Sequence, residues 1–355
     1  MKITYIYHSG FLVESADAYY IFDYYRADFP VTDADKPVYV FVSHRHPDHY
    51  NPYVFEILRE KKVRRMTGII SYDIKPRNYT SHMEGVEIIA AEPDKEYTLD
   101  NGALVRTLRS TDKGVAYVVT FDDGGVPRSV YHAGDLNDWV WEGEDERVNK
   151  WMTGSYRRYL TAVEGMHFDA VMVPVDSRQG DDMFRGIEYL LEKVKADAVY
   201  PMHYWDKPEV IMQFAGKYPQ YADIIRYTED RMDRYSVIED KNPREIVLLR
   251  GSGCVYKKCT FCDYYSDSGK DEDVNYMINR AALSQVTGKY GNIEIINSGS
   301  VFELDKRTIE LIKKRCAECM IHTIHFEAHY LYNNRIEDLR REFADFELKM
   351  KLGLC

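Results

Sequence analysis

The 355-residue sequence is poor in basic residues relative to acidic ones and has no long apolar run. Its formal net charge of −11 argues against a general nucleic-acid-binding protein, because neutralising phosphates requires an excess of lysine and arginine. No apolar stretch approaches the ~20 residues of a membrane span, and residues 1–4 do not begin a signal peptide. We therefore expect a cytoplasmic protein with no membrane association and no nucleic-acid partner beyond what a local basic groove would allow.

Cysteine is absent before Cys254, although the chain contains six cysteines. Three of them are tightly spaced, which favours metal binding in a reducing compartment over a disulfide framework. The length exceeds that of one average domain, and the hydrophobic content of 45% is sufficient for ordinary cores. A polar, turn-forming segment at 240–243 predicts a boundary between a first domain, 1–240, and a second domain, 244–355.

A histidine-rich loop follows an apolar segment, 37–42, that reads as a buried strand. The loop carries His44, His46, Asp48 and His49, and a helical pattern begins just after it. A short loop with fixed ends can point several ligands at one spot. Neutral imidazole suits zinc or iron, and the carboxylate provides for a second, harder metal nearby. A polar surface loop is the alternative interpretation.

The order His-x-His-x-Asp-His in this loop resembles the signature of the metallo-β-lactamase superfamily. The segment His8–Phe11 resembles an early turn in its ascorbate-6-phosphate-lactonase-like branch, where a lone histidine is expected to be structural or to support a ligand. The resemblance implies an α/β fold, an αββα sandwich, and a metal-dependent hydrolase.

Further positions match the superfamily motif by motif. Asp135 follows a strand-like segment and corresponds to the aspartate that bridges two metals, and His203 at another strand end corresponds to a ligand of the second metal. The superfamily usually has one more histidine at the place that reads 108–114 here, where Asp112 is the best substitute. A carboxylate there favours iron or manganese over zinc, or leaves that site weak. The resemblance implies one or two divalent metals (Zn, Fe or Mn) held by His44, His46, Asp48, His49, Asp112, Asp135 and His203.

Were the site formed, coordination would lower the pKa of bound water towards ~7 and provide a metal-bound hydroxide. Asp48 and Asp135 are the candidate catalytic residues, because their carboxylates would orient that hydroxide. A phosphodiester, a lactone or an amide would each fit as a small-molecule substrate, and the sequence does not choose among them.

Four residues are candidates for substrate contact. Trp139 and Trp141 stand close to Asp135 in the sequence and would wall a pocket, with ordinary packing as the alternative. Asp176 ends a strand and would support a ligand or touch the substrate, while Arg178 offers a guanidinium to an anionic group. A surface position is the alternative for Arg178.

The second region begins with an apolar strand, 246–249, followed by a loop with Cys254, Cys259 and Cys262. Three thiolates can hold three corners of a [4Fe–4S] cluster and leave one iron free. The loop resembles that of the radical S-adenosylmethionine superfamily, with four residues rather than the usual three between the first two cysteines. A structural zinc site is the competitor, but no obvious fourth ligand follows.

The next strand-like segment ends in Asn297, Ser298, Gly299 and Ser300, which resembles the motif that holds the methionine end of S-adenosylmethionine in that superfamily. A complete core resembles six strand–helix units, and only about the first half precedes Cys355. We expect a partial parallel (βα) barrel that pairs with a second copy of the chain or with a partner completing the half barrel.

Three functional hypotheses follow. The first is a metal-dependent hydrolase with an appended iron–sulfur cluster-binding segment. The second is a radical S-adenosylmethionine enzyme, or a subunit of one, in which the first domain prepares substrate. The third is a non-catalytic metal-binding interaction protein.

Overall fold

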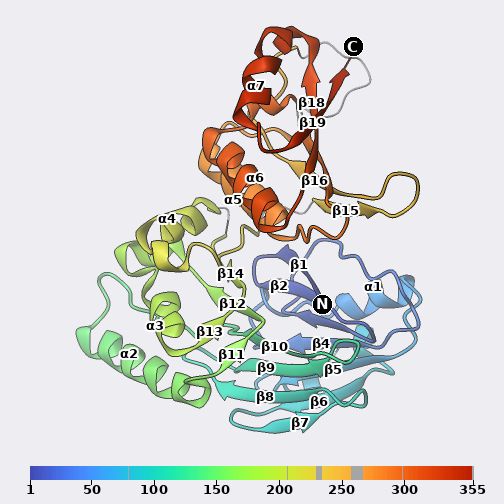
Figure 1. Ribbon diagram of the computed structural model, residues 1–355. Helices are drawn as coiled ribbons and strands as arrows, with labels where there is room; N and C mark the ends of the chain where they lie inside the picture. Colours follow the sequence, from blue (N-terminus) through green and yellow to red (C-terminus); the bar gives the residue numbers. More distant parts are fainter. Residues whose placement is uncertain (79, 206, 229–233, 257–266, 298, 354–355) are drawn as a thin grey trace. The chain divides into compact units, whose positions relative to one another are not determined.

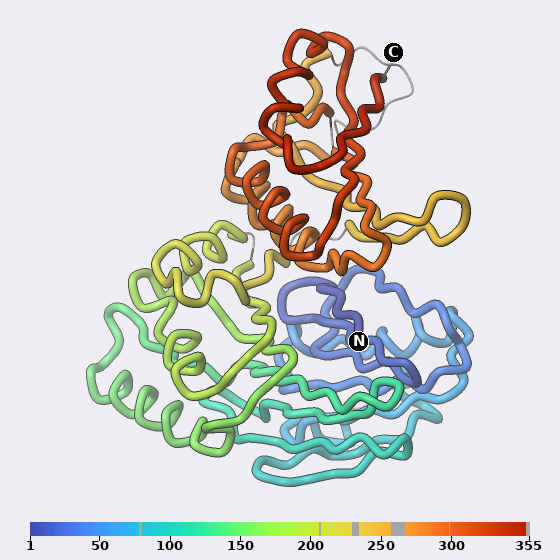
Figure 2. The backbone as a smooth tube through the Cα atoms, viewed as in Figure 1, coloured from blue at the N-terminus to red at the C-terminus, as the bar shows by residue number. Residues whose placement is uncertain are grey.

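Two units make up the chain, Met1–Arg231 and Met232–Cys355. The computed structural model describes all residues except 79, 206, 229–233, 257–266, 298 and 354–355 (Figures 1 and 2). The second unit begins before the segment 240–243 because β15 (Tyr235–Ile238) pairs with β16 (Arg244–Leu249). Among the described residues, no helix combines the length and apolar character needed to span a bilayer.

Two six-stranded sheets form the first unit, in the orders β1-β2-β3-β4-β5-β6 and β14-β12-β10-β9-β8-β7. The first sheet consists of β1 (Lys2–Tyr7), β2 (Gly10–Glu14), β3 (Tyr19–Phe22), β4 (Val38–Val42), β5 (Met66–Ser71) and β6 (Glu87–Ala91). The second consists of β7 (Glu96–Thr98), β8 (Leu104–Arg109), β9 (Val115–Asp122), β10 (Pro127–His132), β12 (Ala170–Pro174) and β14 (Val199–Met202). The short strands β11 (His167–Phe168) and β13 (Lys195–Ala196) pair beside them.

The two sheets pack face to face through aromatic side chains. The rings of Tyr20 and Phe121 stack with centroids 4.7 Å apart, and those of Phe41 and Tyr117 meet edge to face at 5.2 Å. The Tyr117 hydroxyl also donates a hydrogen bond to the carbonyl oxygen of Val42 at 2.8 Å, across the interface. Side chains alternate along a strand, so these residues form the inner face of each sheet.

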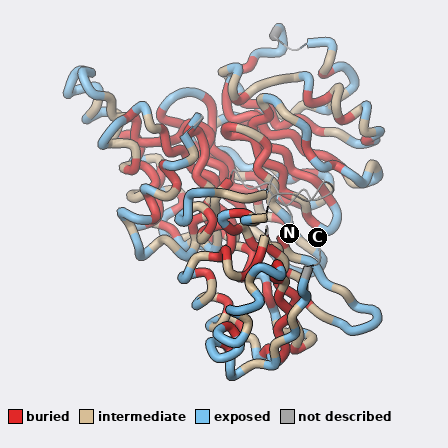
Figure 3. Tube along the Cα trace, turned by 90° about the horizontal axis from the view of Figure 1, so that it is seen from above, coloured by how far each residue is buried: buried red, intermediate tan, exposed pale blue. Residues whose placement is uncertain are grey.

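The outer face of the first sheet is covered by α1 (Val54–Glu60), whose Phe55 and Leu58 join a core with Val38 and Val40. Because both faces of β3 and β4 are buried, these strands read as continuous apolar runs in the sequence. The helices α2 (Glu146–Leu160), α3 (Arg185–Lys193) and α4 (Glu209–Lys217) lie on the opposite side of the two sheets (Figure 1). The buried strands form the red interior in Figure 3. The unit is therefore an αββα sandwich.

Parallel strands bring the site segments to one edge of the sandwich. β3 pairs in parallel with β4, and β10, β12 and β14 form a parallel set in the other sheet. The carboxyl ends of parallel strands lie at the same edge, where ligand sites of α/β sheets are usually found. Asp23, Ser43, Ala133, Val175 and His203 are the first residues after these five strands.

The second unit has a five-stranded sheet in the order β15-β16-β17-β18-β19, parallel from β16 onward. Strands and helices alternate along it: after β16 come α5 (Glu272–Ser284), β17 (Asn292–Asn297), α6 (Lys306–Glu318), β18 (Thr323–His329), α7 (Ile336–Glu342) and β19 (Glu347–Gly353). Its core packs helix residues such as Ile312 and Cys316 against strand residues such as Ile295 and Phe326. Burial raises the pKa of the Cys316 thiol to about 12, so this cysteine is a packing residue. The described strands form an open sheet rather than a closed barrel.

Candidate metal centre

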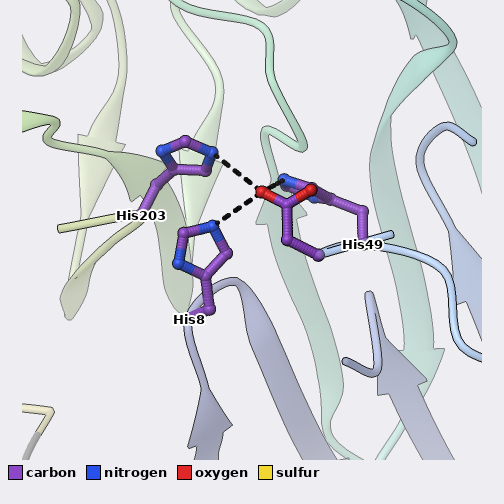
Figure 4. Close-up of side chains that lie close together, drawn as sticks. His8, His49 and His203 are labelled. Atoms are coloured by element: carbon purple, nitrogen blue, oxygen red, sulfur yellow. Dashed lines mark ion pairs between the residues drawn. The ribbon is translucent and has the colours of Figure 1, made fainter. Parts of the chain in front are cut away.

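Two groups of ligand-type side chains meet at the strand ends of the first unit. One comprises His44, His46, Asp112 and Asp135, and the other comprises His8, Asp48, His49 and His203. Within each group the candidate ligand atoms all lie within 4.8 Å of one another. In Figure 4 the imidazoles of His8, His49 and His203 point at one carboxylate. It is that of Asp48, whose Oδ2 lies 3.2 Å from Nε2 of His8, 3.8 Å from Nε2 of His49 and 3.9 Å from Nε2 of His203.

The carboxylate of Asp135 faces both groups. Its Oδ2 lies 3.3 Å from Nε2 of His44, while its Oδ1 lies 3.2 Å from Nε2 of His49 and 3.5 Å from Nε2 of His203. One oxygen is thus directed to each side. This is the geometry expected of a carboxylate that bridges two cations.

Asp23 orients two of the histidines from behind. Its fully buried carboxylate accepts hydrogen bonds from Nδ1 of His49 at 2.7 Å and from the Ser43 hydroxyl at 2.6 Å. The Ser43 oxygen, in turn, lies 3.0 Å from Nδ1 of His44 and is placed to accept its proton. With a proton on each Nδ1, the Nε2 lone pairs of His44 and His49 face the site, which is the tautomer a metal requires.

Asp176 orients His203 through its Nδ1, as Asp23 orients His49. It is buried, and its Oδ2 lies 3.0 Å from Nδ1 of His203. Nε of Arg178 donates to the same carboxylate at 2.9 Å and 3.0 Å. Burial opposes ionisation of Asp176, but its bonds with His203 and Arg178 outweigh burial and lower its pKa below the ordinary value. Asp176 therefore supports His203 as an anion.

Several polar atoms at the centre are buried without a hydrogen-bond partner in the described part of the chain. They are both ring nitrogens of His8, Nε2 of His44, Nε2 of His49 and Oδ1 of Asp135. A buried polar atom left unpaired costs free energy, so a set of them converging on one space indicates a missing partner. Imidazole nitrogens and carboxylate oxygens together suit zinc, iron or manganese. The residues present therefore fit a divalent metal centre.

The charges at the centre are arranged to attract cations. Burial alone would lower the pKa of His44, but the carboxylates of Asp135, Asp23 and Asp112 outweigh burial and raise it to about 9. Burial likewise opposes ionisation of Asp135, yet the surrounding histidines lower its pKa well below the ordinary value. The carboxylates thus favour positive charge at this centre, and a bound metal cation would supply that charge in place of a proton on His44.

Asp112, the expected substitute for a missing histidine, lies at the solvent side of the first group. Its Oδ2 is 3.5 Å from Nδ1 of His46, and both side chains are more than one-third exposed. The loop that carries it is held close to the histidine loop, because the backbone N–H of Val115 donates to the carbonyl of Ser43 at 2.9 Å. Gly114 permits this approach: it has a φ of +70°, and a Cβ there would lie 1.9 Å from that carbonyl oxygen.

A cavity of about 350 Å³ opens above the ligand groups. Three of the four predicted substrate-contact residues, Trp139, Trp141 and Arg178, line this cavity, and Asp176 does not. Its lining residues are His46, Asp48, Asp112, Asp135, Trp139, Trp141, Met152, Arg178, His203 and Trp205. A cavity of this size suits a small molecule rather than a polymer.

The structure brings together residues to which the sequence analysis gave little weight. His8 is only 1% exposed and belongs to the second group, whereas a role that is structural or that supports a ligand was expected. Asp23 is fully buried and hydrogen-bonded to His49, and Trp205 lines the cavity. All three have a positive φ, 58° at His8, 41° at Asp23 and 54° at Trp205, a conformation uncommon outside glycine that no sequence pattern would reveal.

In the second unit, the predicted cofactor segment is described only in part. Cys259, Cys262 and Ser298 lie outside the described residues. Cys254 is partly buried, and a Cβ on Gly299 would lie 3.0 Å from its backbone nitrogen. The carboxylate of Glu303 accepts hydrogen bonds from the N–H groups of Val255 at 2.9 Å and Ser300 at 2.7 Å. The start of the cysteine loop is thus attached to the turn after β17.

The side-chain amide of Asn297, another residue of that segment, is fully buried, and neither its nitrogen nor its oxygen has a hydrogen-bond partner among the described residues. It therefore has both a donor and an acceptor available where the strand ends.

One family model matches part of the first unit. Residues 2–146 match the model of the beta-lactamase superfamily domain. The metallo hydrolase Igni18 from Ignicoccus hospitalis is 20% identical over 63% of this chain and 93% of its own, with a TM-score of 0.41. CmlA, a diiron beta-hydroxylase from Streptomyces venezuelae, is 11% identical over 57% of this chain and 44% of its own, with a TM-score of 0.38. None of the curated proteins matches the chain.

A queuine lyase from Clostridium spiroforme, solved bound to SAM and queuine, is 48% identical over 34% of this chain, with a TM-score of 0.34. The chain spans about half of that protein, 53% of its length. The family match and the two packed sheets support the predicted α/β sandwich, and the second unit is an open, mainly parallel sheet with alternating helices, as expected of a partial (βα) barrel.

Proposed function

We propose that the first unit, whose residues 2–146 match the beta-lactamase superfamily domain, is a hydrolase of the metallo-β-lactamase type with its metal ions held by the two groups that meet at Asp135. The observation that carries this proposal is the position of the Asp135 carboxylate. Its two oxygens face separate sets of imidazoles, within 3.5 Å of three histidine nitrogens. A single bridging carboxylate allows two cations to act on one substrate.

In this proposal, His44, His46 and Asp112 would hold one metal, His8, Asp48, His49 and His203 would hold the other, and Asp135 would serve both. Such a pair supplies Lewis-acid polarisation of the substrate and a lowered pKa for the attacking water. The ligand Nδ1 atoms are held by Asp23, Ser43 and Asp176, which fixes the imidazoles before the substrate arrives.

Asp48 and Asp135 are the proposed catalytic residues. Their carboxylates face the same cavity, and the side chain of Asp48 is 20% exposed while that of Asp135 is only 8% exposed. The more accessible Asp48 is placed to accept a hydrogen bond from the attacking water and so to orient it. Trp139 packs against His203 with ring centroids 5.5 Å apart, so it limits water on that side.

The reaction class is hydrolysis of a phosphodiester, a lactone or an amide. Each has an electrophilic centre whose oxygen gains charge during attack, and that charge is what a metal pair stabilises. The cavity supports a small-molecule substrate rather than a macromolecule.

The test is a substrate panel with the full-length chain: bis(p-nitrophenyl) phosphate, γ-thiobutyrolactone and acetyl-p-nitroanilide. We expect hydrolysis of at least one compound, loss on chelation and recovery on adding metal. Losing a residue that hydrogen-bonds a metal-bound histidine typically costs roughly 10–100-fold in activity. His49→Ala removes a proposed ligand itself, so it should lower the rate by at least that factor. His167→Ala is the matched control, because this exposed histidine pairs with Asp197 away from the cavity. Equal rates for His49→Ala and the parent would disprove the proposal.

A second candidate function concerns the other unit. The 48% identity to a SAM-bound lyase favours a [4Fe–4S] cluster held by Cys254, Cys259 and Cys262, with S-adenosylmethionine bound beside Asn297–Ser300. The attachment of Cys254 and Val255 to the turn at Gly299 supports this, because it brings the cysteine loop next to the proposed cofactor segment.

Anaerobic reconstitution with iron and sulfide tests this second function. We expect about four irons with matching sulfide per chain, and loss of the cluster in Cys254→Ala but not in Cys316→Ala, whose thiol is buried in the core. A parent chain that incorporates no acid-labile sulfide would argue against it.

A further inference from the structure

Three of the four tryptophans of the chain line the cavity above the metal-ligand groups. They are Trp139, Trp141 and Trp205. The fourth, Trp151, lies on α2, is 59% exposed and is not part of the lining. Tryptophan is thus concentrated at one small cavity in a chain that uses it sparingly.

Together with Arg178, these indoles form a wall that runs from the ligand groups to solvent. Trp139 is 6% exposed, and its Nε1 donates to the backbone oxygen of Asp135 at 2.8 Å. Trp141 stacks on Trp139 with centroids 5.8 Å apart and planes 1° from parallel. Trp205 is 36% exposed and lies 4.3 Å from the ring of His8. The wall therefore begins at the proposed bridging residue and ends at the mouth of the cavity.

Arg178 lies between the two outer indoles. Its guanidinium carbon is 5.8 Å from the ring centroid of Trp141 and 5.2 Å from that of Trp205. Asp176 binds its Nε and Nη2, which fixes the orientation of the guanidinium. Nη1 has no hydrogen-bond partner among the described residues, so it is available to donate to a bound molecule.

Packing alone does not account for this arrangement. Trp205 lines the cavity while 36% of its surface stays exposed, and its φ of 54° is a conformation that is strained for a bulky residue. Aromatic faces beside a guanidinium form a platform on which flat rings stack. Aliphatic ligands gain only burial on such a surface and no stacking.

We propose that this wall binds a small, flat aromatic or heteroaromatic molecule whose acceptor oxygen faces Nη1 of Arg178. The inference rests on the proposed hydrolase and specifies its substrate class: an aromatic or heteroaromatic ester, lactone, amide or phosphate. The ring stacks on Trp141 and Trp205, and this places the bond to be hydrolysed over Asp48 and Asp135.

Ligand binding to the full-length, metal-loaded chain tests the inference without depending on hydrolysis. The probes are 2-naphthoate and decalin-2-carboxylate, which share a carboxylate and a fused ten-carbon frame but differ in flatness and π-character. Direct binding of the carboxylate to metal would be common to both. We expect 2-naphthoate to bind about tenfold more tightly, since stacking on one aromatic side chain contributes roughly that factor. It should also quench most of the tryptophan fluorescence. Equal affinities would overturn the proposal.

Substitutions test whether the preference for 2-naphthoate comes from the wall. Trp205→Leu should lower the affinity for 2-naphthoate about tenfold and leave that for decalin-2-carboxylate unchanged, and Trp205→Tyr should restore most of the loss. Trp151→Leu is the control and should change neither affinity. Arg178→Gln should weaken 2-naphthoate binding but not binding of neutral 2-naphthol. Loss of naphthoate affinity in Trp151→Leu as large as in Trp205→Leu would contradict the assignment.

The result also separates this inference from the proposed hydrolase. Selective naphthoate binding in a chain that hydrolyses nothing would support the aromatic pocket and oppose the hydrolase. Metal-dependent hydrolysis with no preference for naphthoate over decalin-2-carboxylate would support the hydrolase and overturn the aromatic pocket.

Discussion

His203 and Asp176 form a buried hydrogen bond of 3.0 Å between Nδ1 and Oδ2. The same carboxylate binds the guanidinium of Arg178, which lines the cavity beside Trp141 and Trp205. Asp176 thereby positions both a proposed metal ligand, His203, and a proposed substrate contact, Arg178. Replacing Asp176 should therefore weaken metal binding and substrate binding together.

Asp176→Asn tests this coupling. The amide is uncharged, so it supports His203 less well and no longer holds Arg178 through two charged bonds. We expect metal affinity to fall roughly 10–100-fold, as it does when other residues that hydrogen-bond a metal-binding histidine are replaced. Competition with a chromogenic chelator measures the change.

The control for that variant is Asp169→Asn. Asp169 also pairs with an arginine, Arg128, and accepts a backbone bond from Ser129 at 2.7 Å, but it does not line the cavity. It should leave metal affinity at the parental value. A similar loss in both variants would show that Asp176 acts on the fold rather than on the site.

Gly114→Ala should destabilise the first unit strongly. The added Cβ would lie 1.9 Å from the carbonyl oxygen of Ser43, so the loops of His44 and Asp112 must move apart. We expect a loss of ~3 kcal/mol together with lower metal content. Gly102→Ala is the matched control: its φ is +83° but its Cβ would meet open space, so only the backbone cost of ~1 kcal/mol remains. Urea unfolding measures the loss of stability in each variant. Equal losses would show that contact between the added Cβ and the Ser43 carbonyl oxygen does not destabilise Gly114→Ala.

His8→Ala should weaken one metal site selectively. Nε2 of His8 lies 3.2 Å from Asp48, and it is buried without a hydrogen-bond partner in the described chain. In a two-equivalent titration we expect one equivalent to bind at least tenfold more weakly and the other to be unchanged. His82→Ala, a surface exchange near Glu56, should alter neither equivalent. An unchanged titration for His8→Ala would give His8 a structural role only.

Glu245 should make the second unit sensitive to acid. It is fully buried and accepts hydrogen bonds from the Tyr235 hydroxyl and from the backbone of Thr287 and Gly288. Burial opposes ionisation, but these bonds outweigh it and lower the pKa of Glu245 below its ordinary 4.5. Its stabilisation is therefore complete above pH 4.5 and is lost as the pH falls through the lower, folded-state pKa.

Glu245→Gln should thus cost about 2 kcal/mol near neutral pH, and the difference from the parent should shrink in acid. Hydrogen exchange of amides in β16 and β17, compared between parent and variant at each pH, reports on this unit alone. Glu239→Gln, at an exposed carboxylate, is the control and should stay close to the parent. If the stability difference between the parent and Glu245→Gln grew as the pH fell, the predicted direction of the pH dependence would be contradicted.

Sequence patterns predicted those features that depend on a single local segment of the chain. The two-sided burial of β4 gives a continuous apolar run, and the histidine loop after it has a recognisable spacing. Asp135 and His203 could be proposed because each follows a strand. The structure brings these residues to one centre, and their roles as ligands stay predictions.

Other features depend on contacts between distant segments. His8 meets His203 because β1 and β14 end at the same edge, where the backbone N–H of His203 donates to the carbonyl of His8 at 3.2 Å. Asp23 is buried because Ser43 and His49 satisfy its carboxylate. An aspartate at a strand end is more often solvated, so nothing local distinguishes this one.

The most direct test of the account is the metal content of the full-length chain, purified anaerobically and measured with its acid-labile sulfide. Two ligand groups that share Asp135 predict about two metal ions per chain beyond the iron accounted for by sulfide. Asp135→Asn should reduce both occupancies, because its carboxylate faces both groups. One ion or none in the parent, or two ions unchanged in Asp135→Asn, would contradict a shared two-metal centre.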